Sequence, residues 1–454
     1  MTTTVAVRLR ARITERALFP AGVVAVGAVS IAACLPGALR FALWQDEVAS
    51  ARVIAEPRPV GLLQHVAHTE STPPLWYGLA WLVHRCGVGI VDLRLLSVVA
   101  AAFLASATAI AARRVVPWPC ALLAGAAVAL GYQFDFHGRE LRAYELAALL
   151  TLALAVAAGR GGAVLAGVVA AGSLTHYFFL FSVLAVLLWR PRSWRPVAVG
   201  LVPFLLSAPL LAHQYAQHHF SFIRAFDLRT VVTTYWLTFA RAQPHAAALH
   251  AIAPLLLLAS VLAGAFMLAR LSDEGRLWAL LALVPIAAAA LLWLAGLRIY
   301  DVRNLIGAGP FAAVAVTSLL AQLPRRTAMA FASALLVLVV AGFVRANRVP
   351  PVAYDRIAGA LVAEGWRPGQ PIAVYGNVNA LWGPLEWYLP EHPTLAPGPP
   401  GRRPVFIVAV RGRRWLAILL HADATRYVRQ TLVARVDGAA SLLGAQTLVT
   451  ESTR

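Results

Sequence analysis

Long apolar runs, separated by short polar connections, dominate the first three quarters of the chain. A run of about 17–25 apolar residues can cross a bilayer as a helix. The runs cover residues 17–40, 93–112, 119–134, 143–159, 161–174, 177–189, 196–212, 251–269, 277–296, 305–322 and 327–344. We therefore expect an all-α polytopic membrane protein with about 11 transmembrane helices. The runs at 161–174 and 177–189 are short, which favours tilted or re-entrant segments.

Residues 74–90 form a shorter, amphipathic run. His84 and Arg85 interrupt it, and Trp76 and Trp81 suit a membrane interface. This pattern predicts a helix lying along the membrane surface, with a twelfth span as the alternative.

The composition changes after residue 344. A polar helix pattern near 353–364 and strand-like runs at 371–375 and 405–410 are separated by Gly and Pro. We predict a transmembrane domain over residues 1–345 and a small C-terminal α/β domain over residues 346–454.

The composition excludes a soluble globular protein. Hydrophobic residues make up 60% of the 454 residues, charged residues 13%, and the mean hydropathy is +0.71. A soluble domain carries about 25% charged residues. The net charge of +19 raises nucleic acid as a partner, but the arginines lie mostly at the ends of apolar runs, so membrane topology explains them better. We expect no nucleic-acid partner. The three scattered cysteines form neither a disulfide framework nor a metal-ligand spacing.

Arginine-bearing connections indicate which side faces the cytoplasm. Short connections with arginine follow alternate spans, at Arg113-Arg114, Arg160, 190–195, 270–276 and Arg325-Arg326. The N-terminus, with four arginines before the first run, is then cytoplasmic. Residues 41–92 form the first extracytoplasmic loop, with surface helices, and the odd number of spans places the C-terminal domain outside.

Polar residues that could carry chemistry gather on the predicted outer side. Asp46 and Glu47 follow the first span, and Glu70 lies in the polar stretch 41–73. Adjacent acids at a membrane boundary are costly to desolvate, so they are hydrated, paired or bound to a ligand. A solvated acid pair that marks a helix end is the simpler interpretation.

A second group lies at the predicted outer junction of the third and fourth spans. It contains His137, Arg139, Glu140, Arg142 and Tyr144. Arg139 and Arg142 are three residues apart, so on a helix they share a face that could hold a phosphate bidentately. Snorkelling interface anchors are the alternative.

Two further outer turns complete the candidate set. His176 and Tyr177 lie between the two short runs, where a single His is more often structural than catalytic. Arg298, Tyr300 and Arg303 lie before the run at 305–322 and could bind an anionic head group.

Four sequence segments resemble those of a known family. They are Phe41–Ala51, Thr72–Tyr77, Leu93–Ser97 and Arg139–Tyr144. In this order they resemble the integral-membrane glycosyltransferases of the GT-C fold, in particular the family that includes protein O-mannosyltransferases and the aminoarabinose transferases of lipid A. The resemblance covers about residues 17–345, and Trp366–Pro371 with Tyr375 resembles the C-terminal domain of bacterial members. The family often has His before the Pro pair, where this chain has Thr72, so a role for that His does not carry over.

The resemblance implies a transferase in the bacterial inner (plasma) membrane. Its donor is a polyprenyl-phosphate sugar in the outer leaflet, and its acceptor is a lipid, glycan or protein. Asp46 is implied as general base, with Glu47 beside it in the catalytic segment, and the reaction inverts the anomeric configuration. A planar, permanently charged guanidinium suits the leaving phosphate, and the candidates are Arg139, Arg142, Arg298 and Arg303. We expect Glu70, His137, Glu140, Tyr144, His176, Tyr177 and Tyr300 to contact substrate.

Metal dependence and two other function classes stay open. No His/Cys cluster predicts a tightly held transition metal, so no cofactor is expected with certainty, whereas a carboxylate-bound Mg²⁺ or Mn²⁺ remains compatible with the sequence. A transporter or flippase is the main alternative, although its ionisable residues belong at mid-membrane in broken helices. A non-catalytic component of envelope polysaccharide assembly is the other.

Overall fold

The computed structural model describes most of the chain. The described residues are 2–217, 223, 225–240, 247–348, 354–363, 366–369, 372–375, 378–389, 395–397, 406–411, 429–436 and 446–453. They divide into two compact units. One contains Met1–Ala38 and Val53–Val344, and the other contains Leu39–Arg52 and Arg345–Arg454.

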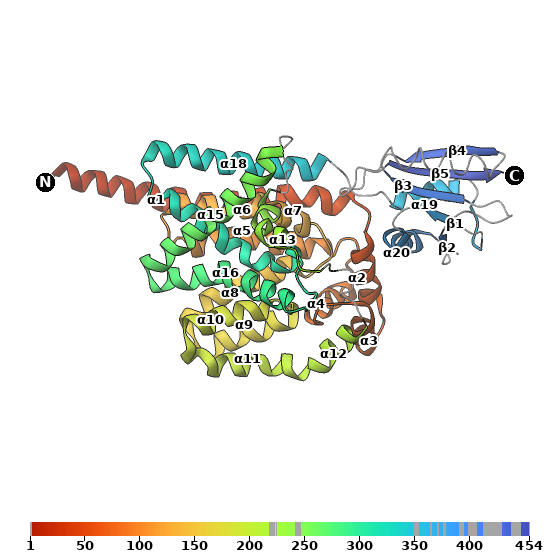
Figure 1. The fold of residues 1–454 in the computed structure, drawn as a ribbon, viewed down its shortest axis with the longest axis horizontal. Coiled ribbons are helices and arrows are strands. Elements are labelled where there is room, and N and C mark those ends of the chain that lie inside the picture. Colours follow the sequence, from red (N-terminus) through yellow and green to blue (C-terminus); the bar gives the residue numbers. More distant parts are fainter. Residues whose placement is uncertain are drawn as a thin grey trace. The chain divides into compact units, whose positions relative to one another are not determined.

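Helices make up the first unit (Figure 1). Their bounds, including those of α2, which crosses the division between the units, are α1 Thr2–Arg40, α2 Gln45–Ala55, α3 Pro59–Thr69, α4 Leu75–Arg85, α5 Arg94–Ala112, α6 Trp118–Leu130, α7 Tyr132–Gly138, α8 Tyr144–Arg160, α9 Gly162–Thr175, α10 Phe179–Trp189, η1 Pro191–Ser193, α11 Trp194–Leu206, α12 Ala208–Ala216, α13 Leu228–Val232, α14 Thr234–Phe239, α15 Ala247–Leu271, α16 Asp273–Leu294, η2 Val302–Ala308, α17 Gly309–Leu320 and α18 Arg325–Arg348.

Every predicted apolar run lies on one of these helices or on a broken pair of them, but fewer of them span a membrane by length. Within the described residues, six segments are long and apolar enough to cross a bilayer, and the number rises to eight if each of two bent pairs counts as one span. The count of about 11 stays a prediction, because the other three predicted runs lie on α8, α9 and α10, which have 17, 14 and 11 residues. The runs at 161–174 and 177–189, which we predicted to be short, form α9 and α10, with 14 and 11 residues.

The two bent pairs arise from local sequence. Helices α6 and α7 meet at 54° around Gly131, which caps α7 in an extended conformation. A Cβ on Gly131 would lie 2.7 Å from the Ala127 carbonyl oxygen, closer than real Cβ contacts allow. Helices α11 and α12 meet at 51° around Ser207, and Pro209 lies in the first turn of α12. A proline is tolerated in the first turn of a helix, but within a continuous helix it removes a backbone hydrogen bond.

Residues 74–90 contain the 11-residue helix α4. A helix rises about 1.5 Å per residue, so α4 covers roughly half of a hydrocarbon core about 30 Å thick. It buries Trp76 and Tyr77 and exposes Leu79 and Leu82. Helix α4 is therefore too short for a twelfth span, and its length and amphipathic burial fit the predicted surface helix.

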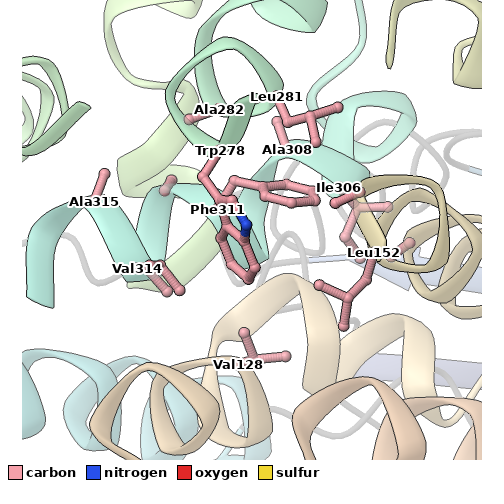
Figure 2. Packing of buried hydrophobic residues seen from close by; sticks show 14 of the residues in the cluster. Val128, Leu152, Trp278, Leu281, Ala282, Ile306, Ala308, Phe311, Val314 and Ala315 are labelled. Carbon is pink, nitrogen blue, oxygen red and sulfur yellow. The ribbon is translucent and has the colours of Figure 1, made fainter. Parts of the chain in front are cut away.

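The buried apolar cluster of the first unit includes the contact between α16 and α17 (Figure 2). Figure 2 shows Trp278 of α16 against Phe311 of α17, with ring centroids 5.1 Å apart and planes at 67°. Both rings are fully buried, and edge-to-face pairs of this kind stabilise cores beyond their buried area. Helix α15 also packs on α17, so closely that a Cβ on Gly264 would overlap the Ala315 carbonyl.

The second unit contains two helices and a sheet. The helices are α19 Tyr354–Ala363 and α20 Val378–Tyr388, and the strands are β1 Ile372–Tyr375, β2 Leu395–Pro397, β3 Phe406–Arg411, β4 Arg429–Val436 and β5 Gln446–Thr453. The strand order is β2-β1-β3-β5-β4. Strand β1 pairs in parallel with β2 and β3, whereas β5 pairs antiparallel with β3 and β4. The predicted helix near 353–364 overlaps α19, and the two predicted strands overlap β1 and β3.

Candidate functional site

The acid pair Asp46-Glu47 lies in the first turn of α2. The Val48 amide donates to the Trp44 carbonyl at 2.9 Å and closes this turn. The Glu47 carboxylate turns back and accepts from the Trp44 amide at 3.2 Å, as a glutamate does in a capping box. Glu47 is buried and Asp46 is half-buried. The two acids therefore differ: Glu47 holds the start of the helix, and Asp46 presents its side chain nearer the surface of its unit.

A buried ion pair joins Glu70 to Arg142 in the first unit. An Arg142 terminal nitrogen lies 2.9 Å from Glu70 Oε2, and the same oxygen accepts from the Tyr77 hydroxyl at 2.6 Å. Burial, and then the Glu70 carboxylate, raise the pKa of Tyr77 well above its ordinary value, so this phenol stays protonated. Thr72 lies 2.8 Å from the Tyr77 hydroxyl. Residues from the 70–77 segment and from the α7–α8 turn thus meet through one carboxylate.

The α7–α8 turn carries a second paired acid. His137 Nδ1 lies 2.7 Å from Glu140 Oε2, and His137 Nε2 lies 2.7 Å from the Gln133 amide oxygen. Arg139 lies 3.6 Å from Asp135, and its side chain is 7% exposed. Arg139 and Arg142 are therefore buried among acids, which is unlike the snorkelling anchors that the sequence left as an alternative.

Aromatic rings connect this turn to His176. The rings of His137 and Tyr144 have centroids 4.2 Å apart, and those of Tyr144 and His176 are 5.7 Å apart. Burial, and then the charges of Arg142 and Arg303, lower the pKa of His176 to about 3. His176 is thus neutral near pH 7, and its Nδ1 accepts from the Phe178 amide at 3.3 Å. Five predicted site residues therefore lie near one another: His137, Arg142, Tyr144, His176 and Arg303.

A small pocket opens beside His176 among α8, α10, α16 and η2. Thr151, Ser182 and Asn304 supply polar groups to its wall, and Phe178 and Ile306 supply apolar ones. A pocket with a few polar groups in an apolar lining can orient a ligand that has both kinds of surface.

Tyr177 is linked to the segment with Glu70 through Gln214, a residue that we did not predict from the sequence. Its hydroxyl donates to the Gln214 side-chain oxygen at 2.8 Å, while Gln214 Nε2 donates to the Val66 and Thr72 carbonyls at 2.8 and 3.3 Å. Gln214 is fully buried and ties α12 to the segment that carries Glu70.

The turn before η2 holds the remaining candidates in three different settings. Tyr300 is buried, stacks on Trp293 at 4.9 Å and shares a 2.6 Å hydrogen bond with Thr234. Burial raises its pKa to about 12. Arg303 Nε lies 2.9 Å from Asp301. Arg298 is exposed and forms no ion pair with a described residue. The structure therefore does not join Arg298 to the buried network.

Two buried acids were missed in the sequence. Asp135 faces Arg139, and Glu145 lies in the first turn of α8 with neither carboxylate oxygen hydrogen-bonded to a described residue. An acid next to a long apolar run is itself a mark of function, and that mark could have identified Glu145.

The described residues contain no group of three or more His, Cys, Asp and Glu side chains that could hold a metal ion. The Mg²⁺ or Mn²⁺ option accordingly gains no support from their arrangement.

Comparison with solved structures identifies the fold of the chain. The chain has the fold of the GT-C integral-membrane glycosyltransferases, as the sequence resemblance implied, and it is a multi-pass α-helical membrane protein. Two solved structures with this fold are ArnT from Cupriavidus metallidurans in the apo state and the same protein bound to undecaprenyl phosphate. The apo structure has a TM-score of 0.55 and 12% identity and covers 98% of each chain. The lipid-bound structure has a TM-score of 0.54 and 13% identity and covers 96% of this chain and 97% of that one.

Comparisons of the sequence alone gave no match. No family model matches it, and no curated protein matches it.

Proposed function

We propose that this protein is an inverting glycosyltransferase that uses a polyprenyl-phosphate sugar. The observation that carries the proposal is a fold shared over 98% of the chain with ArnT, a protein that has been crystallised with undecaprenyl phosphate. The buried arginines of this chain support it, since a buried guanidinium suits a lipid phosphate.

In the proposed reaction Asp46 is the general base. Its carboxylate takes the proton from an acceptor hydroxyl while that oxygen attacks the anomeric carbon. The bond from the anomeric carbon to the phosphate oxygen breaks, and the polyprenyl phosphate leaves with the electron pair. One displacement on one face of the sugar inverts the configuration.

The leaving group needs stabilisation more than protonation. A lipid phosphate is already an anion, so the groups that matter are cations held in place before the reaction. Arg142 and Arg139 are our first candidates because protein contacts already fix both guanidiniums. Arg303 lies in the same neighbourhood, and Arg298 is the remaining candidate. Asp46 and these arginines belong to different units of the structure.

Around the sugar, we assign the contacts to neutral side chains. His176 and Tyr144 offer a ring face and hydrogen bonds, while Glu70, His137 and Glu140 hold the arginine turn in shape. Tyr177 supports the 66–72 backbone through Gln214. Tyr300 lines the turn before η2.

The location in the cell is part of the same proposal. We infer a protein of the bacterial inner membrane, with a cytoplasmic N-terminus and with residues 346–454 as an extracytoplasmic α/β domain. The acceptor is a lipid, glycan or protein. A mass shift on each candidate acceptor, after incubation of membranes with a set of polyprenyl-phosphate sugars, identifies both the sugar and the acceptor.

The transporter alternative has less support. Glu145 lies in the first turn of α8, and the paired Arg142 lies in the turn before it, so these charges stand at a helix end instead of in mid-helix. Buried acids in a transporter mark an ion path across the bilayer, typically at its midplane.

The decisive experiment compares Asp46→Asn with Glu47→Gln in the purified protein. Asp46→Asn removes the base at nearly constant volume, so we expect intact folding and transfer at least about 100-fold slower, the lower range for loss of general-base catalysis. Glu47→Gln weakens one helix-capping contact and should keep measurable transfer. Near-normal turnover by Asp46→Asn would refute the catalytic assignment.

A further inference from the structure

The segment that carries Asp46 is held by α20, a helix far away in the sequence. The Leu43 amide donates to the Tyr388 hydroxyl at 2.7 Å, across 345 positions of the chain. The Arg52 guanidinium pairs with Glu386 at 2.8 Å. Both contacts lie within the second unit, which consists of Leu39–Arg52 and the C-terminal residues.

The two contacts lie on either side of Asp46. Leu43 precedes the first turn of α2, and Arg52 lies in its last turn. Between them, Val48 is fully buried, and a Cβ on Gly383 of α20 would lie 4.0 Å from Val48. The start, the middle and the end of the segment are thereby fixed against a single helix.

The Tyr388 contact is the stronger of the two. Leu43 is fully buried, and its amide lies ahead of α2, where no intrahelical acceptor is available. Without the phenol, a buried backbone donor would lose its partner, which is costly. The Arg52–Glu386 pair is partly exposed, at 42% and 31%, and exposed pairs contribute little.

We propose that Tyr388, assisted by Glu386, positions Asp46 for catalysis. The inference rests on the proposed role of Asp46 as base. Tyr388 is a positioning residue: it acts through the Leu43 backbone and touches no reacting atom. The C-terminal residues are then part of the catalytic apparatus and not an appended module.

Tyr388→Phe tests this inference in the full-length protein. The ring stays and only the hydroxyl is lost, so the folded fraction should not change. We expect kcat to fall about tenfold with the donor KM unchanged, because a small displacement of a base lowers the rate without weakening donor binding.

A charge exchange supplies the second measurement. Arg52→Glu and Glu386→Arg should each lower kcat by about two- to threefold, in line with a partly exposed pair. The double variant should recover the wild-type kcat. Asp355→Asn, an exposed change on α19 of the same unit, is the matched control and should leave kcat unaltered.

The outcomes separate this inference from the proposed function. If Asp46→Asn is inactive while Tyr388→Phe keeps kcat within twofold of wild type, the positioning role is wrong and the catalytic role stands. A loss of activity in Tyr388→Phe that matches a loss of folded protein also overturns the inference. Full turnover by Asp46→Asn would refute both the catalytic role of Asp46 and the positioning role of Tyr388.

Discussion

The two central arginines of the candidate site are buried and already paired with acids. Removing one member of a buried ion pair leaves the other charge without compensation, typically at a cost of about 3–5 kcal/mol. A guanidinium held by an acid on one side can still present its other N–H groups to a phosphate. The same arginine can therefore serve both the fold and the substrate.

The Glu70–Arg142 pair allows these two roles to be separated. We expect Arg142→Gln to lower the unfolding temperature in detergent and to abolish transfer. The double variant Glu70→Gln with Arg142→Gln should recover most of the unfolding temperature, because two neutral amides replace two charges, but it should not recover transfer. Recovery of transfer together with stability would show that Arg142 has no role in donor binding.

His176 gives a pH prediction. Its pKa is about 3 in the folded protein and 6.5 ordinarily. Between these values the unfolded chain binds a proton that the folded protein does not, so stability falls as the pH falls through this window. Above about pH 6.5 His176 is neutral in both the folded and the unfolded protein, so it no longer makes the stability depend on pH.

Unfolding temperatures of wild type and His176→Gln should therefore diverge in their pH dependence only on the acid side. The wild-type protein should lose more stability between about pH 6.5 and 4 than the variant does. Parallel curves would show that His176 is not held neutral.

At this scale the sequence could identify residues by type and position but not by contact. Asp46, Arg139 and Arg142 could be proposed because they lie at the ends of apolar runs on the predicted outer side, where the positive-inside rule leads us to expect fewer arginines. Gln214 is not, because its role depends on carbonyls 148 and 142 positions away. Nothing in its own neighbourhood distinguishes it from a solvent-facing amide.

The helices as elements were predictable because hydropathy is a local property. Each apolar run corresponds to a helix or a broken pair. The number of spans was not predictable in the same way, since breaks at Gly131 and Ser207 depend on one or two residues within an apolar stretch. Such breaks change the direction of the chain without changing its mean hydropathy.

Close helix packing gives a prediction at this scale. Gly264→Ala should destabilise the protein by about 1–3 kcal/mol, because the new methyl group would overlap the Ala315 backbone and force α15 away from α17. Gly167→Ala is the matched control: Gly167 lies in α9, and a Cβ there meets nothing within 4 Å. It should be neutral or stabilising by up to about 1 kcal/mol. Thermal unfolding of both variants checks the difference, and equal values would argue against the α15–α17 contact.

For the whole molecule, the native cysteines offer a test of topology. Cys34 is buried and Cys120 half-buried, whereas Cys86 is exposed after α4, on the predicted extracytoplasmic side. A membrane-impermeant thiol reagent should label Cys86 in intact spheroplasts, and Cys86→Ala should remove the labelling.

The opposite side has its own probe. In the Cys86→Ala background, Gln322→Cys places an exposed thiol in a predicted cytoplasmic connection between α17 and α18. It should react only after permeabilisation. Labelling of Gln322→Cys in intact spheroplasts would reverse the proposed orientation.

The link between Leu43 and Tyr388 also determines the order of biogenesis. A ribosome releases residue 43 long before residue 388, and the N-terminal parts of a chain ordinarily fold first. The segment with Asp46 therefore acquires this hydrogen-bond partner only after 345 further residues have been synthesised. On the proposed role of Tyr388, chains that stop before residue 388 would consequently insert into the bilayer yet stay inert.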